Sequence, residues 1–283
     1  MSLKYLNILF FSIVFLISCI FHKKMGNHKT GSEARNFVLK PEFQKYFEAC
    51  RVGGSIVVYD NLKNQFIVSD TIEIQKETLP ASTFKIINLL VALETKVISS
   101  ENDIIEWQGS TDTVKYGYRP EIYHDMTVKE AFEVSAGWVF VELAKKIGKD
   151  QYKKFLDECN YGNGNLSQGD ADFWNFGHFG ISPMNQVEFL KKLYDGNLPF
   201  SNTNMDIAKR VMITNEYDIR AKTGWTRDGG INTGWWVGYV ENSKGVYFFA
   251  TRLLQDRKNN TPTFGSCRKE ITKSIFKDLE IIK

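Results

Sequence analysis

Cysteine, histidine and metal-binding motifs are scarce in this sequence, and that scarcity excludes several classes of protein. Four cysteines in 283 residues are too few for a disulfide-rich scaffold. No C-x-x-C or H-E-x-x-H motif occurs, and the four histidines lack the spacing of a metal site. We therefore expect no metal and no organic cofactor, with His124 and His178 in surface or structural positions.

Concentrated positive charge is also absent. The net charge is only +3, and lysine and arginine are scattered along the chain. The longest basic cluster, His22-Lys23-Lys24, lies beside an N-terminal apolar run and is explained by that position. The sequence thus predicts no nucleic-acid partner.

That apolar run, from Leu6 to Ser18, is too short for an ordinary transmembrane helix and predicts a signal peptide over residues 1–18. It ends in Leu16-Ile17-Ser18-Cys19, which resembles a bacterial lipobox, so Cys19 is a candidate for lipidation. Ordinary cleavage nearby, with loss of Cys19, is the alternative. Residues 19–36 then form a polar tether, and we expect an exported bacterial protein, periplasmic or anchored to a membrane by its lipid.

Without Cys19, the mature chain keeps Cys50, Cys159 and Cys267. Among these three, at most one disulfide can form. The sequence leaves open which of them pair.

Apolar and β-branched patterning predicts strands near both ends of the chain and helices between them. The predicted strands are 54–60, 64–69, 217–226, 232–241 and 245–254, and the predicted helices are 82–96, 127–134, 139–146, 149–159, 183–195 and 267–279. We therefore expect an α/β fold over residues 37–283, in which both chain ends build a central antiparallel sheet flanked by helices. A mainly helical region, about 99–208, is inserted.

Ser82 and Lys85 are the first candidate catalytic pair. They are three residues apart at the start of a predicted helix, so their side chains lie on one face. The helix N-terminus would stabilise an oxyanion beside Ser82, and lysine can activate a serine if burial keeps its amine neutral. The alternative is an N-capping serine beside a solvated lysine.

Lys222-Thr223-Gly224 supplies a second motif. In a strand, Lys222 offers a cation to an anionic substrate, Thr223 offers a hydroxyl, and Gly224 lets a substrate backbone approach. A solvated strand lysine is the alternative for Lys222 alone. The order S-x-x-K then K-T-G is typical of serine enzymes that recognise penicillin.

The sequence resembles the class D β-lactamases, the oxacillinase family of the serine β-lactamase and penicillin-binding protein superfamily, over essentially the whole mature chain. The resemblance rests on the following segments: Pro80-Ala81-Ser82-Thr83-Phe84-Lys85, Tyr161-Gly162-Asn163, Asp172-Phe173-Trp174, Ile181-Ser182-Pro183, Lys222-Thr223-Gly224-Trp225 and Gly234-Trp235-Trp236-Val237-Gly238. Class A enzymes and penicillin-binding proteins would have asparagine where Gly137 stands.

The resemblance implies a role for each matched residue. Ser82 would be the acylated nucleophile and Lys85, N-carboxylated by carbon dioxide, the general base. Trp174 would donate its indole N–H to the carbamate, although a plain core tryptophan is the alternative. Ser135, helped by Lys222, would pass a proton to the leaving nitrogen.

The resemblance also implies the groups that bind the substrate. The backbone N–H groups of Ser82 and Trp225 would form the oxyanion hole, and Thr223, Gly224, Trp225 and Arg268 would contact the substrate. Arg268 would hold its carboxylate, or be a surface charge. Tyr161, Gly162, Asn163 and Gly137 would shape the site.

Gly137 departs from the family pattern, which usually has valine there to wall off the modified lysine. Water or carbon dioxide would then reach Lys85 more freely, or Trp138 or Phe140 would fill the gap. We expect activity to depend strongly on added bicarbonate.

The predicted function is therefore hydrolysis of β-lactam antibiotics through a serine acyl-enzyme, conferring antibiotic resistance. Penicillins of the oxacillin type are the expected substrates, with some cephalosporins or carbapenems as further candidates. A non-hydrolysing β-lactam sensor and a small penicillin-binding domain are the alternatives. The sequence is compatible with a monomer or a homodimer.

Overall fold

The computed structural model describes residues 36–167 and 169–283. The predicted signal peptide, Cys19 and nearly all of the tether lie outside this range. Within it, no helix has both the length and the apolar character needed to cross a membrane.

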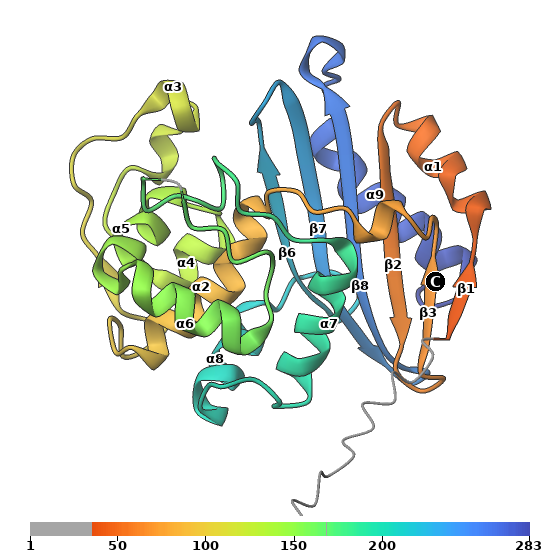
Figure 1. Cartoon of the computed structure of the whole chain (residues 1–283), viewed down its shortest axis with the longest axis horizontal. Coiled ribbons are helices and arrows are strands. Elements are labelled where there is room, and N and C mark those ends of the chain that lie inside the picture. The colour runs from red at the N-terminus through yellow and green to blue at the C-terminus, as the bar shows by residue number, and fades with distance from the viewer. Residues whose placement is uncertain (1–35, 168) are drawn as a thin grey trace, which may run out of the picture. The chain divides into compact units, whose positions relative to one another are not determined.

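A six-stranded sheet forms the centre of the fold (Figure 1). Its order is β1 (Phe37–Leu39), β3 (Gln65–Val68), β2 (Gly53–Asp60), β8 (Gly245–Asp256), β7 (Ile231–Asn242) and β6 (Ile219–Thr226). Strand β2 pairs antiparallel with β8, so the two ends of the chain share one sheet, as the sequence predicted. The predicted antiparallel arrangement fails only at β1, an unpredicted strand that runs parallel to β3 and makes the sheet mixed.

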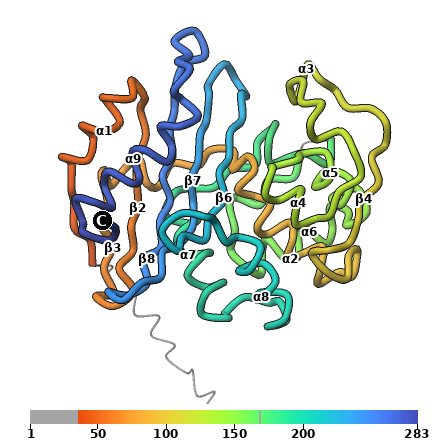
Figure 2. The backbone as a smooth tube through the Cα atoms, turned by 180° about the vertical axis from the view of Figure 1, so that it is seen from behind, coloured from red at the N-terminus to blue at the C-terminus, as the bar shows by residue number. Residues whose placement is uncertain are grey.

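Both faces of the sheet are covered, because neighbouring residues of a strand point to opposite sides. In β2, Ile56 joins a core with α1 (Gln44–Ala49) and α9 (Phe264–Asp278). The next residue, Val57, joins a larger core with α2 (Lys85–Glu94) and α7 (Pro183–Tyr194). Burial on both faces explains why β2 is apolar without alternation. Figures 1 and 2 show α1 and α9 close together at one side of the sheet.

The inserted region between α2 and β6 is mainly helical, as predicted. It contains β4 (Ile104–Ile105), α3 (Thr113–Tyr116), β5 (Met126–Thr127), α4 (Val128–Glu133), α5 (Gly137–Ile147), α6 (Lys149–Cys159) and α8 (Asn202–Val211). Helix α2 is buried at its centre and packs against α5, α6 and α8. A 3₁₀ turn, Ala81–Phe84, precedes α2 and packs against β6 and β7. The start of α2 therefore lies at the edge of the sheet that β6 forms.

One disulfide joins Cys50, which follows α1, to Cys267 in α9, and Cys159 is a buried free thiol. This pairing resolves the alternatives that the sequence left open. The bond links two helices on the same face of the sheet, 217 residues apart in the chain.

Candidate active site

Ser82 and Lys85 lie together at the junction of the 3₁₀ turn and α2. The sequence predicted one continuous helix from Ser82, but Ser82 lies in the 3₁₀ turn and Lys85 begins the α-helix. Side chains three residues apart eclipse in a 3₁₀ turn, which brings the two groups closer than α-helical geometry would. The Lys85 Nζ donates a hydrogen bond of 2.7 Å to the Ser82 Oγ.

The amine of Lys85 is almost removed from water. Its side chain is only 1% exposed, and Nζ lies 5.2 Å from the centre of the Phe140 ring. Desolvation lowers the pKa of Lys85 from 10.5 to about 8, partly opposed by the charge of Asp172 and reinforced by Arg119. The structure thus provides the buried lysine on which the predicted activation of Ser82 depends.

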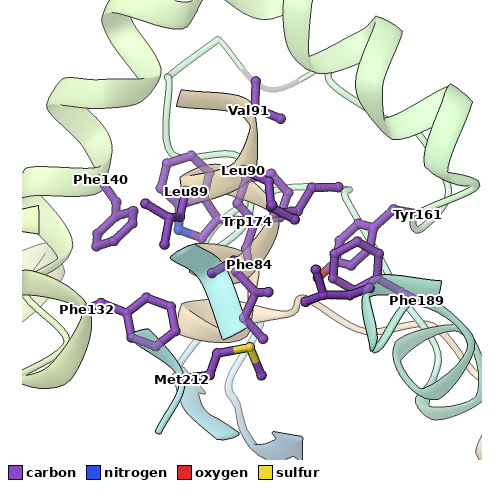
Figure 3. Packing of buried hydrophobic residues seen from close by; sticks show 14 of the residues in the cluster. Phe84, Leu89, Leu90, Val91, Phe132, Phe140, Tyr161, Trp174, Phe189 and Met212 are labelled. Atoms are coloured by element: carbon purple, nitrogen blue, oxygen red, sulfur yellow. The ribbon is translucent and has the colours of Figure 1, made fainter. Parts of the chain in front are cut away.

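Trp174 lies in the aromatic core, close to Phe84 (Figure 3). It is 1% exposed and stacks on Phe84, with ring centroids 4.9 Å apart and planes 8° apart. Within the described part of the chain, its indole Nε1 has no hydrogen-bond partner. A buried N–H without an acceptor is costly, so this donor is available to an additional acceptor group.

Ser135, which lines the cavity, contacts Lys222, a buried residue from a different element. Ser135 has a φ of 60°, in the bend between α4 and α5, and Lys222 comes from β6. The Lys222 Nζ donates a hydrogen bond of 3.2 Å to the Ser135 Oγ. Desolvation, with repulsion from Lys85 as the next contribution, lowers the pKa of Lys222 well below its usual value. This pair can pass a proton between a substrate and a nearby amine.

Strand β6 brings the second motif against the first. A Cβ on Gly224 would lie 2.8 Å from the Pro80 carbonyl oxygen and 3.2 Å from the Ser82 backbone nitrogen. Any larger residue would therefore push the β6 backbone away from Ser82. The sequence predicted that Gly224 admits a substrate backbone, and the close neighbour in the structure is instead the Pro80–Ser82 backbone, which keeps this part of β6 beside the serine.

Arg268 projects from the second turn of α9 toward β6. Its Nη1 donates to the Gly224 carbonyl oxygen at 2.7 Å, and its Nε donates to the Gly265 carbonyl oxygen at 2.8 Å. Burial lowers the pKa of Arg268 to about 10. The guanidinium is thus held next to the K-T-G strand, rather than projecting from a free surface.

Tyr161, Gly162 and Asn163 lie behind the cavity. The Tyr161 ring is buried against Phe84, Phe179 and Phe189. Gly162 has a φ of 67°, and a Cβ there would lie 2.6 Å from the Gly180 carbonyl oxygen. The Asn163 side chain bonds to backbone groups: its Nδ2 donates to the His178 carbonyl oxygen, and its Oδ1 accepts from the Gly180 N–H. None of the three is among the residues that line the cavity.

Gly137 begins α5 and lines the cavity. Apart from its two chain neighbours and the backbone of α5, a Cβ placed on it would meet no atom within 4 Å. The space beside Gly137 is therefore open. The Phe140 side chain does not fill this space, because its ring lies over the Lys85 amine. Trp138, the next residue in the chain, lines the same cavity and donates its indole N–H to the Ile122 carbonyl oxygen.

A cavity of about 640 Å³ brings most of the predicted residues together. Those that line it are Ser82, Lys85, Ser135, Gly137, Thr223, Gly224, Trp225 and Arg268. Trp174, Lys222 and the Tyr161–Asn163 segment lie in the surrounding layer. Among the described residues, the only group of potential metal ligands that lie close together is Cys50, Cys267 and Glu270. Its two sulfurs are joined in the disulfide.

Sequence reasoning missed the roles of Asp172 and Tyr116. Asp172 is 1% exposed and accepts hydrogen bonds from the Tyr116 hydroxyl at 2.7 Å and from the Asn175 Nδ2 at 2.8 Å. Desolvation raises the pKa of Asp172 to about 6. An acidic residue directly before Phe173-Trp174 was the available signal, because aspartate in an apolar segment requires partners.

The comparisons with known proteins agree with this geometry. A family model described as the penicillin binding protein transpeptidase domain matches residues 54–277. Beta-lactamase OXA-10 of Pseudomonas aeruginosa is 34% identical over 278 residues, covering 96% of this chain and 98% of the relative. Beta-lactamase OXA-2 of Salmonella typhimurium is 33% identical, covering 86% of each chain.

Solved structures show the same relationship in three dimensions. The class D beta-lactamase of Sebaldella termitidis superimposes with a TM-score of 0.81 and 36% identity, covering 88% of this chain and all of that one. A class D beta-lactamase from Nostoc gives a TM-score of 0.78 with 34% identity, covering 84% and 98%.

Proposed function

The chain belongs to the class D β-lactamases, and from this premise we propose that it hydrolyses β-lactam antibiotics through an acyl-enzyme on Ser82 and so confers resistance. The observation that carries the proposal is the 2.7 Å hydrogen bond between the Ser82 hydroxyl and a lysine whose pKa is lowered to about 8. Penicillins of the oxacillin type are the proposed substrates, with some cephalosporins or carbapenems as further candidates.

A group near the substrate can perform each step of the reaction. The Ser82 hydroxyl transfers its proton toward Lys85 while Oγ attacks the lactam carbonyl carbon, and the backbone beside Gly224 faces the developing oxyanion. The carbon–nitrogen bond then breaks, and the leaving nitrogen takes a proton through Ser135 and Lys222, whose side chains are 3.2 Å apart. Water hydrolyses the resulting ester and restores Ser82.

We further propose that Lys85 works as its N-carboxylated form. Two features support this: a desolvated amine with an unusually large neutral fraction, and the partnerless Nε1 of buried Trp174, which fits an anionic acceptor. When present, the carbamate would supply the general base for acylation and deacylation. Carbon-13 NMR after addition of labelled bicarbonate tests this directly, since Lys85→Ala must lose the carbamate signal.

The open space at Gly137 supports a strong dependence of activity on bicarbonate, because no side chain other than those of its chain neighbours lies within 4 Å of a Cβ placed there to limit exchange. Rates in degassed buffer should rise when bicarbonate is added, and Gly137→Val should reduce that rise. Equal rates with and without bicarbonate in the unchanged protein would contradict this proposal.

Export and anchoring rest on sequence alone. We propose a signal peptide over residues 1–18, lipidation of Cys19 and a periplasmic or membrane-anchored location. Mass spectrometry of the mature N-terminus from bacterial membranes would detect the lipid, whereas an N-terminus after Cys19 would indicate ordinary cleavage.

A chromogenic cephalosporin separates hydrolysis from mere binding. Continued turnover by the purified protein is the expected result, with Ser82→Ala and Lys85→Ala inactive. One stoichiometric burst would instead indicate a β-lactam sensor or a penicillin-binding domain. Mass spectrometry of the trapped adduct must place it on Ser82.

A further inference from the structure

The walls of the active-site cavity carry charge of one sign. Among the described residues that line it, the cations are Lys85, Lys115, Arg119, Arg227, Arg257 and Arg268, and none is aspartate or glutamate. Clefts lined by one sign of charge concentrate ligands of the opposite sign. The cavity is therefore suited to ligands with more than one negative charge.

Four of these cations already have a role or a partner. Lys85 serves Ser82, and Arg268 is held at Gly224 to meet the carboxylate of the substrate's fused ring. Lys115 forms an ion pair with Asp170 at 3.1 Å, and Arg119 forms one with Glu121 at 2.8 Å. These contacts leave two guanidinium groups.

Arg227 and Arg257 are those two. Both side chains are exposed, and within the described part of the chain neither makes an ion pair. The Arg227 guanidinium lies 4.9 Å from the centre of the Trp225 ring. Guanidinium groups without a carboxylate partner are well suited to bind one from a ligand.

The two arginines belong to one rim of the cavity. Arg227 follows β6, and Arg257 follows β8, at the same end of the sheet in Figure 1. The backbone N–H of Arg257 donates to the Gly230 carbonyl oxygen in the β6–β7 turn at 3.0 Å, which ties the two segments together. The adjacent acids do not line the cavity, since Asp228 accepts from the Gly177 N–H and Asp256 from the Lys258 N–H.

We propose that Arg227 and Arg257 form a second anion subsite that favours β-lactams with an additional carboxylate on the acyl side chain. This inference rests on the proposed function. Arg268 takes the ring carboxylate, while the Arg227–Arg257 rim takes the second one. Because both arginines are exposed, the preference amounts to about three- to tenfold in kcat/KM and weakens as salt rises.

Benzylpenicillin and carbenicillin form a matched pair for the test, because they differ only by the side-chain carboxylate. The carbenicillin-to-benzylpenicillin ratio of kcat/KM should fall about fivefold in the double variant R227Q/R257Q, mainly through a higher KM for carbenicillin. The dependence of this ratio on salt concentration should also be weaker in the double variant. Lys258→Gln is the control, because Lys258 lies beside Arg257 and does not line the cavity.

An unchanged ratio in R227Q/R257Q, or an equal fall for both penicillins, overturns the subsite. If the unchanged protein opens neither penicillin, the proposed function fails, but the subsite is still decided by binding. Calorimetric titration of Ser82→Ala, with and without the two arginine substitutions, should then give the same fivefold change in the ratio of dissociation constants. No change in that ratio refutes the inference.

Discussion

Replacing Lys85 by methionine should stabilise the folded protein while abolishing hydrolysis. The lysine is 1% exposed, and its pKa is lowered from 10.5 to about 8 by burial. Keeping the ammonium charged in the folded state therefore costs roughly 3 kcal/mol at pH 7. Methionine has a similar length without the charge, but it loses the hydrogen bond to Ser82, worth about 1 kcal/mol. We expect a net gain of about 2 kcal/mol in the free energy of unfolding.

The gain should depend on pH in a defined direction. Below pH 8, Lys85 is protonated in both the folded and the unfolded state, so the full free-energy cost of burying its charged ammonium is present. Between pH 8 and 10.5 the unfolded chain binds more protons than the folded one. The free energy of unfolding of the unchanged protein therefore rises with pH in this window. The advantage of Lys85→Met should therefore shrink steadily through this window.

Urea unfolding followed by tryptophan fluorescence, in buffer depleted of carbon dioxide, measures both effects at a series of pH values. Lys154→Met, on the exposed face of α6, is the control and should show no such pH dependence. If Lys85→Met is less stable than the unchanged protein at pH 7, and the difference does not vary with pH, the amine is not desolvated as described.

Three further predictions concern residues around the site. Gly224→Ala should lower kcat/KM at least tenfold in steady-state assays, because its methyl group would push β6 away from Ser82; unchanged kinetics would refute the close approach. Trp174→Phe should weaken the carbon-13 carbamate signal at limiting bicarbonate, since it removes the partnerless indole N–H; an equal signal would exclude Trp174 as the donor. Reducing the Cys50–Cys267 disulfide should lower the urea-unfolding free energy by roughly 2–5 kcal/mol, and no shift of the midpoint would contradict it.

Elements with strong local patterns could be predicted from the sequence. Strands β7 and β8 are long, aromatic and β-branched, and α6 begins and ends where its apolar periodicity predicts. Strand β1 and helix α1 were missed because three and six residues carry little periodic signal and are stabilised by packing. Helix α8 was not separated from its helical region, although Ser201 caps it by accepting from the Asn204 N–H.

The candidate site likewise has features that the sequence predicts and features that it does not. The Ser82–Lys85 pair follows from a spacing of three residues, and the apolar neighbours already predict a buried amine. By contrast, the Tyr116–Asp172 hydrogen bond joins residues 56 positions apart, and no local pattern predicts that pairing. The open space at Gly137 likewise depends on which side chains pack around it, and the sequence left that undecided.

Residue type and short spacing are enough to predict Ser82 as the nucleophile, Lys85 as its partner and the motifs of the family. The folded structure was needed to show that Lys222 meets Ser135 across 87 residues, that Cys267 pairs with Cys50, and that Arg227 and Arg257 line one cavity. The physical reason is that contacts between distant segments arise from how sheet and helices pack, and packing sums many weak contacts that no single stretch of sequence contains.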